Sequence, residues 1–154
     1  MLDLNTFKMV VENTPLISID FIVKNGDNKI LLGKRVNKPA QDFLFTLGGR
    51  VYKDEKLENA KKRILKNEIG LNIEEYNLKF IGIFEHFYRD SFVDDNITTH
   101  YVNLAYEIEV SHIQDLPKAQ HNIYVWLSND EIMNSKEVHN YVKDYFKNSI
   151  GERI

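Results

Sequence analysis

The stretch from Gly48 to Leu71, GGRVYKDEKLENAKKRILKNEIGL, constrains the fold more than any other part of the chain. It opens on a double glycine and continues into a run whose apolar residues recur at three- and four-residue steps. This spacing predicts a helix over roughly residues 56–69. Gly70 suits the left-handed residue that commonly ends a helix. The stretch therefore predicts a loop, a helix and a glycine stop in one continuous segment.

This segment resembles the Nudix box, the loop–helix signature G-x5-E-x7-R-E-U-x-E-E-x-G-U of hydrolases that act on linked nucleoside diphosphates. The first glycine, first glutamate, arginine, last glutamate and closing glycine of the signature match Gly49, Glu55, Arg63, Glu68 and Gly70. Glu55 and Arg63 are expected to pair and to fix the loop on the helix. Two family glutamates are missing, because Ile64 and Asn67 stand in their places.

Motifs outside the box narrow the resemblance. SIDFIVKN, LLGKRVNKPAQ, EHFYRDSF, TTHYV and QHNIYVWL follow one another along the chain. Together with the box they resemble the GDP-mannose mannosyl hydrolase branch of the Nudix superfamily, from about residue 7 to residue 126. The resemblance implies an α/β/α sandwich and a homodimer. It also implies hydrolysis of GDP-mannose, or a related GDP-hexose, to GDP and free sugar by water attack at the anomeric carbon with inversion.

The reduced box bears on the metal. The family usually places three carboxylates there, so the resemblance implies fewer ions here, one Mg²⁺ per active site. Its implied ligands are the Glu68 carboxylate, the Gly48 backbone carbonyl and the Gln120 side-chain amide. Oxygen donors suit this hard cation, which takes few protein ligands and keeps waters. Without the flanking motifs, Glu68 would be interpreted as a solvated helix-end acid and Gln120 as a surface loop residue.

Two residues are candidates for chemistry at the sugar. His121 is the candidate general base, because a neutral imidazole is available near pH 7 to take a proton from water. A lone loop histidine is more often an exposed bystander, and the match to the branch favours catalysis. Asp20 lies within a strand of apolar residues, where a carboxylate is costly without partners. It is either an outward, solvated position or a functional group that contacts the sugar or stabilises positive charge at the anomeric carbon.

The leaving diphosphate needs positive charge, and Arg35 and Arg50 are the candidates. A guanidinium gives permanent, bidentate contacts to phosphate. Tyr101 is a candidate hydrogen-bond donor to the same group. The resemblance also implies that Phe7 and His86 contact substrate, although Phe7 equally fits the buried face of a first helix. Each arginine taken alone would be interpreted as part of a surface ion pair.

The rest of the chain predicts an α+β fold with a mixed β-sheet, in a single Nudix hydrolase domain over residues 1–154. Strands and helices occur without regular βαβ alternation, which argues against a doubly wound fold. The predicted strands are 16–24, 30–35, 43–47, 78–88, 98–110 and 124–127, and the predicted helices lie near the start, at 56–69, after Ser128 and along 138–146.

Composition excludes several classes of function. The formal net charge of -3 gives no basic surface for nucleic acid. The chain has 0 cysteines, so disulfides, thiolate metal sites and cysteine nucleophiles are excluded. No signal peptide or apolar run of membrane length is present, and we expect a cytoplasmic protein whose partners are a GDP-sugar and a second copy of itself.

Two other functions stay open. The first is a standard Nudix pyrophosphohydrolase that releases GMP and a sugar phosphate, which the absent box carboxylates disfavour. The second is a non-catalytic nucleotide-sugar-binding Nudix domain. The retention of a set of candidate site residues counters this second alternative: Arg35, Arg50, Glu68, Gln120 and His121.

Overall fold

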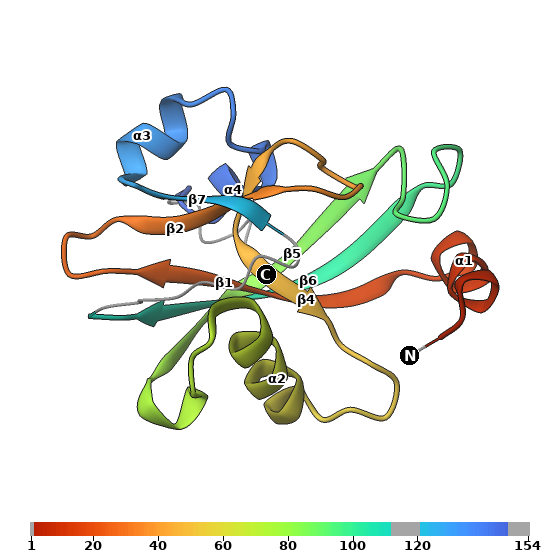
Figure 1. Cartoon of the computed structure of the whole chain (residues 1–154), viewed down its shortest axis with the longest axis horizontal. Helices are drawn as coiled ribbons and strands as arrows, with labels where there is room; N and C mark the ends of the chain where they lie inside the picture. The colour runs from red at the N-terminus through yellow and green to blue at the C-terminus, as the bar shows by residue number, and fades with distance from the viewer. Residues whose placement is uncertain (1, 112–120, 148–154) are drawn as a thin grey trace.

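The computed structural model describes residues 2–111 and 121–147. Its strands are β1 (Leu16–Lys24), β2 (Ile30–Arg35), β3 (Leu44–Phe45), β4 (Leu47–Arg50), β5 (Leu78–Tyr88), β6 (Thr99–Glu109) and β7 (His121–Leu127). Its helices are α1 (Leu4–Asn13), α2 (Leu57–Ile69), α3 (Asn129–Asn134), α4 (Asn140–Asp144) and the short 3₁₀ helix η1 (Ile73–Glu75). Together they form one sheet with helices on both faces (Figure 1).

The sheet is mixed. Its strand order is β3-β2-β1-β6-β5, with β4 also paired to β1 and β7 to β2. β1 runs parallel to β6, and the other described pairs are antiparallel. Helix α2 covers one face, α3 and α4 lie on the other, and α1 lies beyond one end of the sheet (Figure 1). The predicted α+β sandwich is confirmed.

The side-chain alternation of β1 divides the core between the two faces of the sheet. Ile19, Phe21 and Val23 are fully buried in the cluster that contains the apolar face of α2. Ile22 belongs to the second cluster, with residues of α3 and α4. Because successive side chains of a strand point to opposite faces, Asp20 shares the side of Ile22. The carboxylate therefore faces the layer that contains α4.

The box helix and its loop have the predicted form. Helix α2 spans Leu57–Ile69 and ends at Gly70, whose φ of 79° is left-handed. Arg63 Nε donates to Glu55 Oε1 at 2.8 Å, and Arg63 Nη2 donates to the Arg50 carbonyl at 2.7 Å. The guanidinium holds the pKa of the Glu55 carboxyl below its usual range. The predicted structural pair is confirmed, and it fixes the backbone at Arg50.

Three predicted boundaries are wrong. The strand expected at 43–47 is split at Thr46, because β3 pairs with β2 whereas β4 pairs with β1 and continues through the double glycine. The last strand begins at His121 rather than 124, as its first residues pair with the end of β2. The final helix, predicted along 138–146, is shorter, since Val138 forms a bridge with Leu44 instead.

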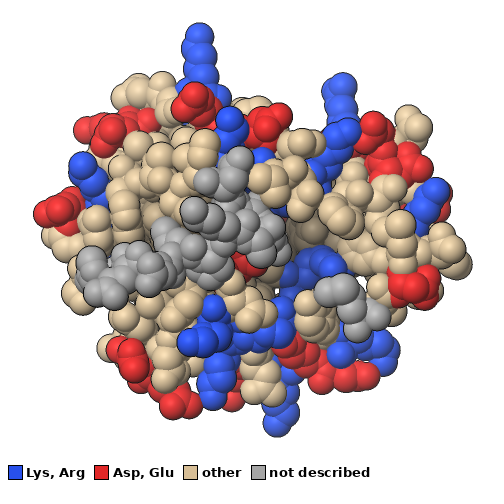
Figure 2. All heavy atoms as spheres, in the orientation of Figure 1, with Lys and Arg blue, Asp and Glu red and all other residues tan. Residues whose placement is uncertain are grey.

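No helix in the described ranges is long and apolar enough to cross a membrane. Figure 2 shows one face of the molecule, on which acidic and basic side chains are interspersed. This mixture agrees with the small net charge of -3.

Candidate functional site

A cavity of about 350 Å³ lies between one end of the sheet, α1 and two loops. This volume falls within the ~300–1,000 Å³ typical of small-molecule sites. The cavity brings together residues from helix α1 and from the six strands β1 to β6. The predicted site residues that line it are Phe7, Asp20, Arg35, Gly48, Arg50, His86 and Tyr101.

Strand register explains this gathering. Ser18 of β1 pairs with Arg50 of β4 on one side and with Asn103 of β6 on the other. Two residues along β6, Tyr101 pairs with His86 of β5. Residues two apart on a strand share a face, so these rows present their side chains to the same space. Pairing between strands that are far apart in sequence thus assembles one wall of the cavity.

The positive side of the cavity is formed by two fixed guanidinium groups. Arg35 Nε donates to the Pro39 carbonyl at 2.9 Å, which holds the side chain against the loop after β2. The Arg50 guanidinium carbon lies 4.0 Å from the centre of the Phe7 ring, a cation–π contact. Phe7 also packs in the apolar cluster around α1, which agrees with its alternative position on the buried face of a first helix. Its contact with substrate stays a prediction.

Tyr101 lies in the electrostatic field of both guanidiniums. Burial raises the pKa of its hydroxyl, while the charges of Arg50 and Arg35 lower it. The net direction is upward, so the phenol keeps its proton near neutral pH. Tyr101 is therefore available as a donor toward an anion that also contacts the arginines.

Asp20 is buried, with 6% of its surface exposed, so its interpretation as a solvated outward residue is wrong. Thr46 Oγ1 donates to Asp20 Oδ2 at 3.0 Å, and the Tyr145 hydroxyl donates to the same oxygen. The other oxygen, Oδ1, lies beside Gly48, where an added Cβ would approach it to 2.4 Å. The glycine thus leaves room for a carboxylate whose orientation two donors fix.

A buried polar network extends from this carboxylate. Tyr145 comes from the end of α4 and is 3% exposed. Its ring packs edge-on against that of Phe84, with 4.8 Å between the ring centres. Its hydroxyl also lies 3.2 Å from Asn103 Oδ1, and Asn103 Nδ2 donates to Ser18 Oγ at 2.8 Å. Burial and the nearby carboxylate raise the pKa of Tyr145 well above its ordinary value, so it remains a donor.

Tyr145→Phe is expected to lower the free energy of unfolding by about 1–3 kcal/mol, because it leaves the buried Asp20 short of a donor while keeping the ring. Urea denaturation followed by circular dichroism measures this. Tyr52→Phe is the matched control, since Tyr52 is 42% exposed and its loss should stay within about 0.5 kcal/mol. Equal stabilities of the two variants would contradict the role assigned to the Tyr145 hydroxyl.

His86 contributes a buried imidazole with unused hydrogen-bonding capacity. It is 3% exposed and stacks on Tyr141 at 4.4 Å between ring centres. Its Nε2 atom has no hydrogen-bond partner among the residues that the structure describes. Burial lowers the pKa of the ring, so it is neutral at pH 7. An unsatisfied buried nitrogen is costly, and a ligand in the cavity that His86 lines would satisfy it.

Glu68 is on the buried side of α2, with 9% of its surface exposed, so its interpretation as a solvated acid is wrong. Its pKa is raised to about 7, because burial, aided by the charge of Asp20, outweighs the opposing charge of Arg35. Glu68 is not among the described residues that line the cavity, although the charges of two lining residues, Asp20 and Arg35, act on its carboxyl. Its carboxyl also raises the pKa of Tyr124 in β7.

The donors present fit a metal that takes few protein ligands. Ile64 is buried and would lie 3.2 Å from a Cβ on Gly49, so its side chain fills the space beside the double glycine. Asn67 is exposed. Within the described ranges, no three His, Cys, Asp or Glu side chains form a group able to hold an ion. The buried Glu68 carboxyl, whose pKa is about 7, fits a single Mg²⁺ that also takes waters and phosphate oxygens as ligands.

Two predicted site residues lie at the margin of the described chain. Gln120 falls outside the described residues. His121 begins β7, and its backbone is the register partner of Arg35 in β2. This pairing places the main chain of the predicted base beside a cavity residue.

Sequence reasoning missed several residues of the cavity and of the network behind it. Tyr145 lies within the predicted final helix, and the cost of a carboxylate within the apolar strand of Asp20 was the signal that a partner had to exist. Two residues of the motifs EHFYRDSF and TTHYV are not among the described lining residues: Phe87 is 58% exposed, and His100 stacks on it. The residues of the cavity lining that were not singled out include Ser18, Lys38, Thr46, Phe92 and Asn103.

The chain belongs to the NUDIX domain family, whose family model matches residues 14–148. The class defined by fold and box is therefore that of the Nudix hydrolases. Among curated proteins, it is similar to the low-salt glycan biosynthesis protein Agl8 of Haloferax volcanii, with 35% identity over 102 residues. That match covers 66% of this chain and 64% of the relative, which is less than two thirds of the relative's length.

Solved structures support the fold. The MutT protein from Methanosarcina mazei superposes with a TM-score of 0.69 at 19% identity, covering 87% of this chain and 92% of that one. The NUDIX domain of Shewanella oneidensis NrtR, complexed with ADP ribose, gives 0.65 at 18% identity and covers 87% of both chains. At these identities the likeness concerns architecture alone.

Proposed function

We propose that this protein hydrolyses GDP-mannose, or a related GDP-hexose, to GDP and the free sugar. Water attacks the anomeric carbon, and the product sugar has inverted configuration. The observation that carries the proposal is the contrast between two surfaces: a cavity with two fixed guanidiniums, and a box helix on which a buried isoleucine and an exposed asparagine replace two carboxylates.

The cavity is suited to stabilise a departing diphosphate. Arg35 and Arg50 bind its oxygens, and the protonated Tyr101 donates a hydrogen bond to it. Glu68, the Gly48 carbonyl and Gln120 would hold one Mg²⁺, which supplies further positive charge to the leaving group. Donors already in place where charge develops act strongly, because no reorganisation is needed at the moment of bond cleavage.

The other side chains of the site are suited to the sugar. Asp20 is a carboxylate of fixed orientation, and we assign it the stabilisation of positive charge at the anomeric carbon. His86 offers its unpartnered Nε2 to a sugar hydroxyl, and Phe7 closes the site from α1. His121, at the start of β7, is the base that takes a proton from the attacking water.

Two observations favour this reaction over a pyrophosphohydrolase. Attack at phosphorus depends on a cluster of box carboxylates, and two of these positions hold Ile64 and Asn67. The curated relative is named for glycan biosynthesis, which supports a substrate that contains a sugar. A non-catalytic nucleotide-sugar-binding domain is less well supported, because a buried, neutral histidine and a fixed carboxylate line the same cavity. The homodimer, the cytoplasmic location and the single domain stay predictions.

The test is the position of oxygen incorporation. With a panel of GDP-sugars in ¹⁸O-water and Mg²⁺, we expect the label in the released sugar and GDP as the nucleotide product. Label in phosphate together with GMP would establish the pyrophosphohydrolase instead. Magnesium-dependent binding of every GDP-sugar without turnover would establish the binding domain. The same reactions with EDTA serve as the control and should show no turnover.

A further inference from the structure

The cavity contains a third cation that no predicted role explains. Lys38 lies on the loop after β2 and lines the cavity together with Arg35 and Arg50. Asp20 is the one carboxylate among the described lining residues, and its Oδ2 already accepts two hydrogen bonds. The described lining therefore has three positive groups and one negative group. This excess suits a ligand with more than one negative charge.

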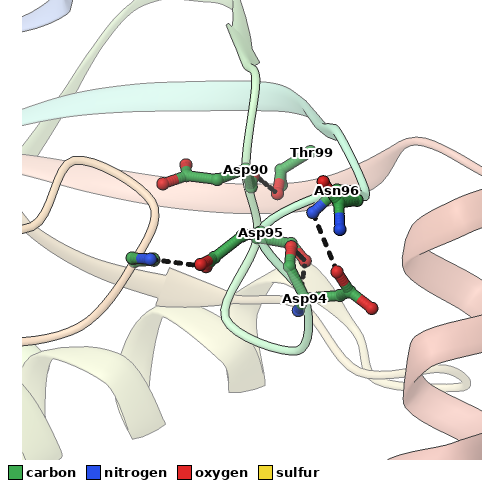
Figure 3. Close-up of polar contacts among 7 residues, drawn as sticks. Asp90, Asp94, Asp95, Asn96 and Thr99 are labelled. Atoms are coloured by element: carbon green, nitrogen blue, oxygen red, sulfur yellow. Dashed lines mark hydrogen bonds and ion pairs between the residues drawn. The ribbon is translucent and has the colours of Figure 1, made fainter.

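The charge of Lys38 is paired with a carboxylate. Its ammonium contacts the carboxylate of Asp95, on the loop that joins β5 to β6. Figure 3 shows Asp95 directed from this loop toward the loop after β2. The Asp95 side chain is 72% exposed and that of Lys38 is 37% exposed. Exposed ion pairs are weak and readily exchanged, so a phosphate in the cavity competes well for the lysine.

The loop that carries Asp95 is held by other contacts. Thr99 Oγ1 donates to the Asp90 carbonyl at 2.7 Å, and Ser91 Oγ donates to the Asp94 carbonyl at 2.9 Å. Asp94 also pairs with Lys8 of α1 at 3.3 Å. In Figure 3 the neighbouring carboxylates of Asp94 and Asp95 diverge. The loop can therefore keep its place when Asp95 loses its partner.

We propose that Lys38 is a phosphate-binding residue and that Asp95 is an internal competitor for it. Entry of a diphosphate transfers the ammonium from the carboxylate to a phosphate oxygen. The inference rests on the proposed diphosphate-containing ligand, but not on which bond is cleaved. It predicts that substitutions of the two members of this ion pair change phosphate affinity in opposite directions. An ion pair that only joined the two loops would not have this effect.

Calorimetric titration with inorganic pyrophosphate and with GDP, each with Mg²⁺, tests the proposal. Lys38→Ala should weaken binding of both about tenfold, because a charge-assisted contact is lost. Asp95→Asn should tighten binding about two- to fivefold, because the competitor is removed. The double variant should bind like Lys38→Ala. Asp94→Asn is the matched control on the same loop and should leave both affinities unchanged.

Weaker or unchanged binding in Asp95→Asn would overturn the competitor role. Unchanged binding in Lys38→Ala would overturn the phosphate contact. Wild-type protein that binds neither pyrophosphate nor GDP would overturn the proposed function and this inference with it. Release of GMP rather than GDP, combined with the expected affinities, would reject the proposed reaction and leave this inference standing.

Discussion

Arg50→Gln is expected to lower the turnover number by about 10²–10³-fold, the usual effect of removing one preorganised donor from a developing negative charge. The Arg50 guanidinium is fixed over the Phe7 ring, and its backbone carbonyl is held by the box arginine. The substitution leaves the backbone contact in place, so the loss should fall on chemistry rather than on folding. Initial rates of GDP release measure it.

Arg89→Gln provides the comparison for this result. Arg89 is an exposed arginine that is not among the described cavity residues, and its replacement should leave the rate within about twofold of wild type. Circular dichroism should show both variants folded. A folded Arg50→Gln protein with a near-normal rate would remove this residue from the site and with it the main support for the proposed leaving-group contacts.

Glu68→Gln is expected to lower the rate by about a hundredfold or more, since a Mg²⁺ ligand loses its charge. The same change should stabilise the metal-free protein at alkaline pH. The folded pKa is about 7 and the ordinary value is 4.5, so the folded state binds more protons between these values. Stability of the wild type therefore falls as pH rises from about 4.5 to about 7, by up to about 3 kcal/mol.

Glutamine never ionises, so the variant does not show this fall. Urea denaturation in EDTA should give similar stabilities at pH 4.5 and a more stable variant at pH 8. Added Mg²⁺ should stabilise the wild type and leave Glu68→Gln unchanged, because a ligand that binds the folded state shifts unfolding by mass action. A Glu68→Gln variant that is less stable than wild type at pH 8 in EDTA would contradict the raised pKa of the buried Glu68 carboxyl.

The box helix was predictable because its determinants are local. Apolar spacing defines the face of α2, and a glycine able to adopt a φ of 79° ends the helix. The Glu55–Arg63 pair was equally predictable from the sequence, since one motif fixes both positions. The mixed sandwich followed from the order of strands and helices, together with the resemblance carried by the motifs.

Other features depend on contacts that no local pattern records. The split at Thr46 arises because two halves of one short segment pair with different strands. The hydroxyl of Tyr145 reaches a carboxylate 125 residues earlier in the chain, and helical periodicity alone assigns that tyrosine to the core. The pairing of Lys38 with Asp95 joins two loops 57 residues apart. Tertiary structure decides each of these, and they lie in or beside the cavity.

The contact between Asp20 and Tyr145 also bears on biosynthesis. Strand β1 leaves the ribosome early, whereas α4 is among the last described segments to follow it. Until then a nascent chain exposes a carboxylate that lacks one of its two donors. A premature stop before α4 would thus leave the buried Asp20 carboxylate without one of its two donors.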